Sequence, residues 1–159
     1  MQELKSTLRV VNEADLEESV SKVGVEVKGM RTRRILAGND ECPSERLRVH
    51  VNTFNGGIQE HLHWHLVEAL YYVISGRAVM EDIEGKNHQI GPGSAIYYPA
   101  GIAGAHSWNI KEEMKLLSIR ATTDPANLVQ FSIDRSTKES SIKLDNLIRT
   151  MGGKFKSLY

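Results

Sequence analysis

Three of the six histidines of this chain fall in one short stretch at strict two-residue spacing, as His61, His63 and His65. Successive side chains of a β-strand point to opposite faces, so an extended chain would aim all three imidazoles at one side. Neutral imidazole is the commonest protein ligand for mid-series divalent metals. A half-exposed strand with histidines in its polar positions would suffice to explain a single His-x-His pair. The third histidine and the Gly56-Gly57 turn before it favour a metal site.

A metal site needs further ligands from strands that lie beside this one. The sequence offers Glu60, Glu68 and, far along the chain, His106. A second polar row comes from residues 46–54, where polar and apolar residues alternate and Arg48, His50 and Asn52 share one face. Such a row normally faces solvent. In a barrel with a polar interior, the same row would line the site instead.

Composition limits the possible function classes. Twenty basic and twenty acidic side chains cancel, and no run of either sign indicates a protein that binds nucleic acid or a membrane surface. The single Cys42 excludes a disulfide framework and a thiolate-rich metal site. No apolar run is long enough to span a bilayer, and the first residues lack the apolar core of a secretory signal. We therefore expect a cytoplasmic protein.

The pattern of elements predicts one domain over residues 1–159. Residues 1–30 form a polar N-terminal arm, in which Asn12 precedes a plausible short capped helix. Residues 31–133 hold about nine short strand patterns separated by turn signals, which is typical of an all-β sandwich or barrel. Residues 134–159 form a tail with a short amphipathic C-terminal helix that ends at Gly152-Gly153.

Residues 45–121 resemble the cupins, which are small double-stranded β-helix (jelly-roll) barrels. The first cupin motif, Gly-x5-His-x-His-x3-4-Glu-x6-Gly, is matched in register by Gly57, His63, His65 and Gly76. The second, Gly-x5-Pro-x-Gly-x2-His-x3-Asn, is matched by Gly93, Pro99 and Gly101, and more loosely by His106 and Asn109. Two motifs in the right order on a strand-rich background indicate the cupin fold.

The departures from these motifs bear on function. Ala69 stands where cupins usually carry a metal-binding glutamate, and Glu68 is one place off. A one-residue slip in a strand sends the side chain to the opposite face, so we expect Glu68 to point away unless a bulge re-aims it. Gly104 holds the usual histidine position of the second motif, and His106 comes two residues later. That shift preserves the face that His106 would meet.

The resemblance therefore implies a three-histidine metal site, made by His63, His65 and His106, without a protein carboxylate. Fe(II) is the favoured ion, and Zn, Ni, Mn or Cu would also suit imidazole ligands. Such a site keeps the double charge of the ion uncompensated, so it should favour a small anionic substrate. The local pattern is similar to three-histidine cupin dioxygenases of the gentisate type. Our first hypothesis is an Fe(II) dioxygenase; the alternatives are a metal-dependent isomerase, decarboxylase or lyase, and a non-catalytic cupin that binds a small molecule.

Four further residues are candidates for contact with the substrate. His61 would point with the ligand pair, either as a fourth ligand or, more simply, as a group at the barrel mouth. His50 and Arg48 would orient the substrate if their row faces inward. Tyr71 shares the face of Ala69 and would meet the substrate there. The family resemblance also implies a homodimer.

Overall fold

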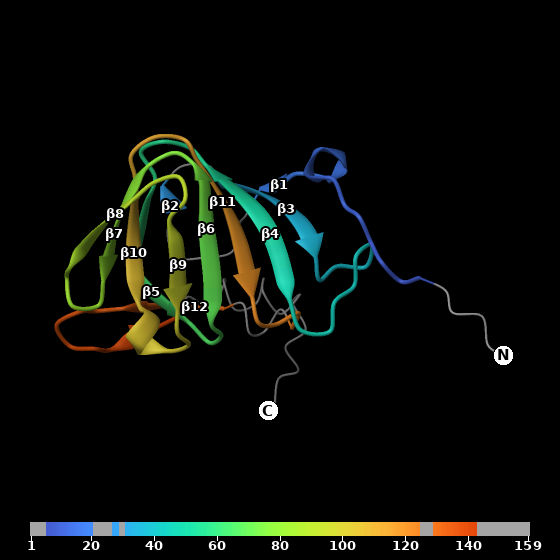
Figure 1. Ribbon diagram of the computed structural model, residues 1–159. Helices are drawn as coiled ribbons and strands as arrows, with labels where there is room; N and C mark the ends of the chain where they lie inside the picture. The colour runs from blue at the N-terminus through green and yellow to red at the C-terminus, as the bar shows by residue number, and fades with distance from the viewer. Residues whose placement is uncertain (1–5, 21–26, 29–30, 125–128, 143–159) are drawn as a thin grey trace, which may run out of the picture.

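Two antiparallel sheets face one another and form the body of the computed structural model, which describes residues 6–20, 27–28, 31–124 and 129–142 (Figure 1). The strands of the first sheet are, in spatial order, β1 (Ser19–Val20), β3 (Arg31–Ala37), β4 (Arg48–Phe54), β11 (Met114–Arg120), β6 (Ala69–Ser75) and β9 (Ala95–Tyr98). The chain crosses repeatedly from one sheet to the other, for example between β4 and β5, between β5 and β6 and between β10 and β11. Strands that are distant in sequence therefore become neighbours.

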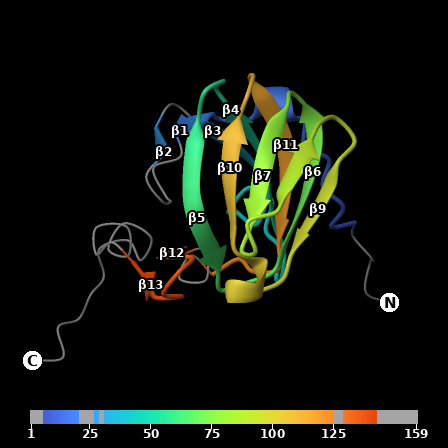
Figure 2. The ribbon, with the colours of Figure 1, turned by 90° about the vertical axis from the view of Figure 1, so that its left-hand side faces the viewer.

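The second sheet carries most of the histidines. Its strands are, in order, β13 (Ser140–Ser141), β12 (Gln130–Ile133), β5 (Gln59–His65), β10 (His106–Ile110), β7 (Ala78–Asp82) and β8 (Asn87–Ile90), and β2 (Val27–Lys28) pairs with one end of β5. Figure 2 looks onto this sheet, with β5, β10 and β7 side by side. The topology thus joins the two motif segments, since β5 and β10 are direct neighbours.

An apolar core fills one part of the space between the sheets. In β6, Ala69, Tyr71 and Val73 are buried and alternate with exposed residues, as expected for a strand with one inward face. Met114 and Leu116 of β11 pack into the same cluster, together with Trp108 and Ile110 of β10. Further along the same inward row of β11 stand Ser118 and Arg120, which are also buried. The core therefore changes from apolar to polar along β11.

Gly76 closes the β6 strand at a point where no side chain fits. Its φ is +83°, in the left-handed region that favours glycine. A Cβ there would lie 2.2 Å from the carbonyl oxygen of Glu113. This steric demand explains why the last position of the first motif is a glycine.

The all-β jelly-roll fold predicted from the sequence is confirmed. The described part of residues 31–133 contains ten strands, where about nine were expected. Asn12 does cap a turn, since its Oδ1 accepts from the amide of Ala14, but the element is η1, a 3-10 helix of three residues (Glu13–Asp15). The expected C-terminal helix lies outside the described residues. Residues 134–142, just before it, form a turn and β13.

Candidate metal centre

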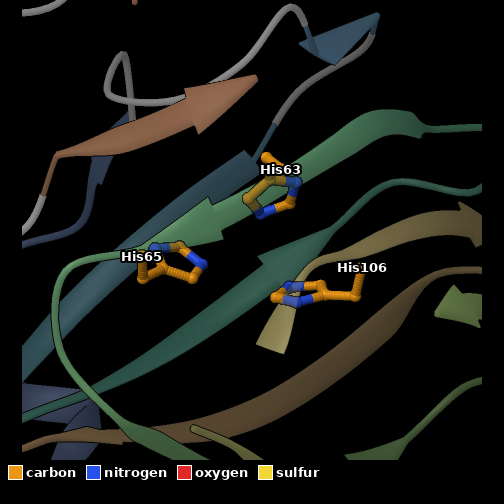
Figure 3. A group of neighbouring side chains, drawn as sticks. All are labelled: His63, His65 and His106. Carbon is orange, nitrogen blue, oxygen red and sulfur yellow. The ribbon is translucent and has the colours of Figure 1, made fainter. Parts of the chain in front are cut away.

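His63, His65 and His106 converge on one point between the two sheets. One ring nitrogen from each of them lies within 4.8 Å of the other two, and all three side chains are buried. Figure 3 shows the three rings turned toward one another, the first two from β5 and the third from β10. His106 is the direct cross-strand partner of His63. The structure thus brings together the three histidines that the sequence predicted as metal ligands.

His61 does not join them, which corrects the expectation that the three histidines of β5 share a face. The pairing of β5 with β10 shifts by one residue, because His106 faces His63 while Trp108 faces Glu60. This β-bulge inserts an extra residue into β5 and reverses the alternation. As a result Glu60 is buried and His61 is exposed. His61 instead lines a groove of about 570 Å³ on the outer face of the second sheet.

Two of the three imidazoles are held with one nitrogen ready for a metal. The Nδ1–H of His63 donates to the carbonyl of His61, and the Nδ1–H of His106 donates to the carbonyl of Gly104, each over 2.8 Å. A hydrogen bond of this kind fixes the tautomer and leaves the Nε2 lone pair free to bind an ion. Gly104, which supplies this carbonyl, cannot be replaced by a residue with a side chain, because a Cβ would lie 2.1 Å from the carbonyl oxygen of Pro99.

His65 is held differently. Its Nδ1 lies 3.0 Å from Nη1 of Arg120, and a guanidinium can only donate. Its Nε2 is buried and has no hydrogen-bond partner among the described residues. In the neutral ring Nδ1 therefore accepts from Arg120 and Nε2 carries the hydrogen, which is the opposite tautomer to that of His63 and His106.

Burial keeps all three imidazoles neutral. Desolvation lowers the pKa of His63, although Glu60 opposes the effect, and it lowers the pKa of His65 and of His106 well below 6.5. The Arg120 guanidinium lowers the pKa of His65 further. Because metal ligation requires a neutral imidazole, the three side chains suit a divalent ion at neutral pH.

Arg120 is the main site residue that sequence reasoning missed. It is buried, and besides contacting His65 it donates from Nη2 to the hydroxyl of Tyr71. Tyr71, a predicted substrate contact, therefore lies beside the metal cluster. A signal was available in β11, where Arg120 belongs to the row of Met114, Leu116 and Ser118. A charged residue that continues an apolar row points inward.

Glu60 places a carboxylate at the edge of the cluster. Its Oε1 accepts from Nη1 of Arg31 over 2.7 Å, and both side chains are buried. Its Oε2 lies 4.0 Å from Nε2 of His63. The sequence offered Glu60 as a possible ligand, but only the bulge in β5 turns it inward. The structure thus has a buried carboxylate near the three histidines, although not at the usual cupin position.

At the position where the first cupin motif usually has a glutamate, the structure agrees with the motif comparison. Ala69 is buried on the inward face of β6, whereas Glu68 is exposed and accepts a hydrogen bond from the hydroxyl of Tyr97. The ring of Tyr98 stacks on that of His106 with centroids 3.8 Å apart and an interplanar angle of 8°. Tyr98 therefore fixes the orientation of one ligand from the opposite sheet.

The polar row of β4 faces inward, which decides between the two possibilities that the sequence left open. His50 and Asn52 are buried, and Arg48 is partly buried at the start of the strand. Asn52 accepts from Nε of Arg33 in β3. Desolvation and the neighbouring arginines lower the pKa of His50 well below 6.5. His50 and Arg48 thus lie on the interior side of the first sheet, on the strand next to that of Arg120.

Comparison with known proteins agrees with this architecture. The model of the cupin domain family matches residues 50–120. No curated protein matches the sequence. In the part of the chain that the structure describes, no helix is long and apolar enough to cross a membrane.

Several solved structures share the fold. The polyketide cyclase RemF from Streptomyces resistomycificus is 17% identical with a TM-score of 0.64, and the match covers 91% of this chain and 93% of that one. A predicted oxalate decarboxylase from Thermotoga maritima is 19% identical (TM-score 0.58, 71% and 98% covered). A sugar phosphate isomerase of the cupin superfamily from Silicibacter pomeroyi is 22% identical (TM-score 0.59, 73% and 77% covered). At these identities the likeness shows the fold alone.

Proposed function

We propose that this chain, of which residues 50–120 match the model of the cupin domain family, is a metal-dependent enzyme that converts a small anionic organic substrate at the site of His63, His65 and His106. The observation that carries this proposal is the convergence of three buried, neutral imidazoles, each of which brings one ring nitrogen within 4.8 Å of those of the other two. Buried histidines without such a role usually have both nitrogens satisfied. Here Nε2 of His65 is buried without a hydrogen-bond partner among the described residues, so the site holds a polar atom that a bound group would satisfy.

The donor set fits a divalent ion that accepts imidazole, such as Fe(II), Zn, Ni, Mn or Cu. When bound, the ion would act as a Lewis acid toward a carbonyl or enolate oxygen of the substrate. The chain itself adds positive charge, because Arg120 stands against His65. A neutral substrate would leave this charge uncompensated inside the protein, so the site favours an anion.

For the reaction we propose non-oxidative proton transfer next to a carbonyl, as in isomerisation, elimination and cyclisation, or as in decarboxylation, where CO₂ leaves and a proton takes its place. Glu60 offers a carboxylate oxygen that faces the ligand histidines and can take up a proton. The hydroxyl oxygen of Tyr71 accepts from Arg120, so its own hydrogen remains available to a substrate oxygen. The names of the similar structures, a cyclase, a predicted decarboxylase and an isomerase, support this class.

Fe(II)-dependent dioxygenation is the second candidate. It is favoured by Ala69, which leaves the three-histidine set without a carboxylate at the usual position and so leaves several coordination positions open. Oxygen uptake separates the two candidates. The Fe(II)-loaded protein would be given a panel of hydroxy-aromatic, diketone and keto acids in an oxygen electrode. Turnover without oxygen consumption supports proton transfer, and stoichiometric consumption supports dioxygenation.

Metal analysis tests the proposal as a whole. We expect the purified protein to hold one divalent ion per chain after dialysis, and the His63→Ala/His65→Ala variant to hold none. The His61→Ala variant is the matched control, because it removes an exposed histidine of the same strand. A folded protein that binds no metal under any of these conditions would refute a metal-dependent enzyme and leave a small-molecule-binding cupin.

The homodimer expected from the resemblance is also part of this proposal. Sedimentation equilibrium of the metal-loaded protein tests it directly. A mass of twice the 17.8 kDa of one chain is the expected result.

A further inference from the structure

Four polar side chains form one patch on the inner face of the first sheet, and none of the four is a candidate metal ligand. In the pairing of β4 with β11, Arg48 lies directly opposite Arg120, and His50 directly opposite Ser118. Directly opposed residues have Cβ atoms about 4.5–5.5 Å apart. His50, Ser118 and Arg120 are buried, and Arg48 is partly buried. We call these four residues the β4–β11 patch.

Several polar atoms of the β4–β11 patch have no partner. Within the described part of the chain, Nδ1 of His50, Oγ of Ser118 and Nε of Arg48 are all buried without a hydrogen bond. His50 is 2% exposed and Ser118 is fully buried, so solvent does not satisfy them. Native proteins leave few buried polar groups unpaired, and several together mark a place where a ligand completes the hydrogen bonds.

The charge around the patch shows the kind of ligand that fits. Burial first, and then Arg33, Arg120, Arg48 and Arg31 in that order, lower the pKa of His50. These guanidinium groups therefore act together on one region. Burial and the same neighbours lower the pKa of Arg33 to about 9. Glu60 is the only buried carboxylate of the described residues, and Arg31 already binds it.

We propose that the β4–β11 patch is an oxyanion subsite that holds a second anionic group of the substrate, a carboxylate or a phosphate. The patch offers guanidinium and hydroxyl donors and no acidic group, which is the chemistry of carboxylate and phosphate recognition. It is continuous with the metal centre, because Arg120 belongs to the patch and also contacts His65. This inference rests on the proposed function. The subsite then assigns the substrate to the small dianions, which would place one oxygen-bearing end at the histidines and an oxyanion at the other end.

The test measures oxyanion binding by the metal-free protein. Inorganic phosphate and glutarate are each titrated by isothermal calorimetry into the wild type and into the Arg48→Gln and Ser118→Ala variants. The matched control is Arg46→Gln, which removes the same charge from an exposed position two residues earlier. We expect at least one of the two anions to bind the wild type and the control equally. We expect its affinity to fall about tenfold or more in Arg48→Gln, and severalfold in Ser118→Ala.

The outcomes separate this inference from the proposed function. Phosphate binding alone identifies a phosphorylated substrate class, and glutarate binding alone identifies a dicarboxylate. A His63→Ala/His106→Ala variant should lose the metal but keep the oxyanion affinity, because neither residue belongs to the patch. Equal affinities of the wild type and both patch variants would overturn the subsite, as would an Arg46→Gln loss as large as that of Arg48→Gln. Neither result would affect the metal centre.

Discussion

Arg120 lies directly opposite Ala69 in the pairing of β11 with β6. A permanent cation therefore flanks the very position where the cupin motif usually carries a carboxylate ligand. The guanidinium also contacts His65, one of the three candidate ligands. The local charge is thus reversed: a carboxylate would attract the ion, whereas Arg120 repels it and attracts an anion instead. Metal and substrate affinity should respond to this residue in opposite directions.

Replacing Arg120 with Gln tests this reversal. Without the cation beside His65, we expect the affinity for the divalent ion to rise about tenfold, a difference of about 1.4 kcal/mol. The same variant should bind an anionic substrate about 10–100-fold more weakly, because a hydrogen bond to a charged group is lost. Competition with a chromophoric chelator measures the first effect, and KM measures the second. Arg77→Gln, an exposed arginine paired with Glu112, is the control. A parallel fall of both affinities would contradict the charge argument.

The ligand assignment predicts a sharp contrast within one strand. We expect His63→Ala to weaken metal binding more than 100-fold, since loss of a supporting residue alone costs about 10–100-fold at such sites. His61→Ala should leave the affinity within about twofold, because the bulge turns His61 to the outer face. Calorimetric titration of each metal-free variant with Zn²⁺ measures the difference. Equal losses in the two variants would mean that His61 reaches the ion.

How far the sequence predicts this site depends on the regularity of β5. Strict spacing predicted that His63 and His65 lie together, and the motif comparison pointed to Ala69 and, two residues past its usual place, to His106; the structure brings the three histidines together. The same period-two argument failed for His61 and did not foresee the inward turn of Glu60. A bulge is set by the pairing with β10, so the spacing of residues along one strand does not reveal it.

The interior charges depend on tertiary structure in another way. Arg31, Arg48 and Arg120 come from three strands of one sheet, and the last of these strands, β11, is far from the other two in the sequence. An arginine in a half-apolar strand normally faces solvent, and only the closure of the two sheets decides which face is the interior. Sequence reasoning could therefore name Arg48 and His50 as conditional candidates, and the row of Met114, Leu116 and Ser118 was the one sequence signal for Arg120.

The buried ion pair of Glu60 and Arg31 predicts a large effect on stability. Glu60→Gln removes one charge of this buried pair, so we expect the free energy of unfolding to fall by roughly 3–5 kcal/mol. The paired change Arg31→Met/Glu60→Leu removes both charges and should recover most of that loss. Urea unfolding of the metal-free proteins measures all three. If Glu60→Gln unfolds at the same urea concentration as the wild type, the ion pair is not a structural element.

The pH dependence of stability follows from four buried imidazoles, those of His50, His63, His65 and His106. Each has a pKa lowered by burial in the folded protein, whereas the unfolded chain has the ordinary value of 6.5. Below about pH 6.5 the unfolded chain therefore binds protons that the folded chain does not. Stability is fully present above this pH and falls as the pH drops toward the lowered values, by up to about 1.4 kcal/mol per pH unit for each group.

Urea unfolding of the metal-free protein between pH 7.5 and pH 5.5 measures this slope, and excess Zn²⁺ should raise the stability most at the upper end of this range, so that the slope becomes at least as steep. The ion binds only the neutral imidazoles of the folded chain, so it opposes their protonation and adds stability by mass action. A His50→Gln variant should have a shallower slope both with and without the ion, because His50 is buried but is not a ligand. Stability that stays constant down to pH 5.5 would show that the folded protein binds protons at these histidines as readily as the unfolded chain does.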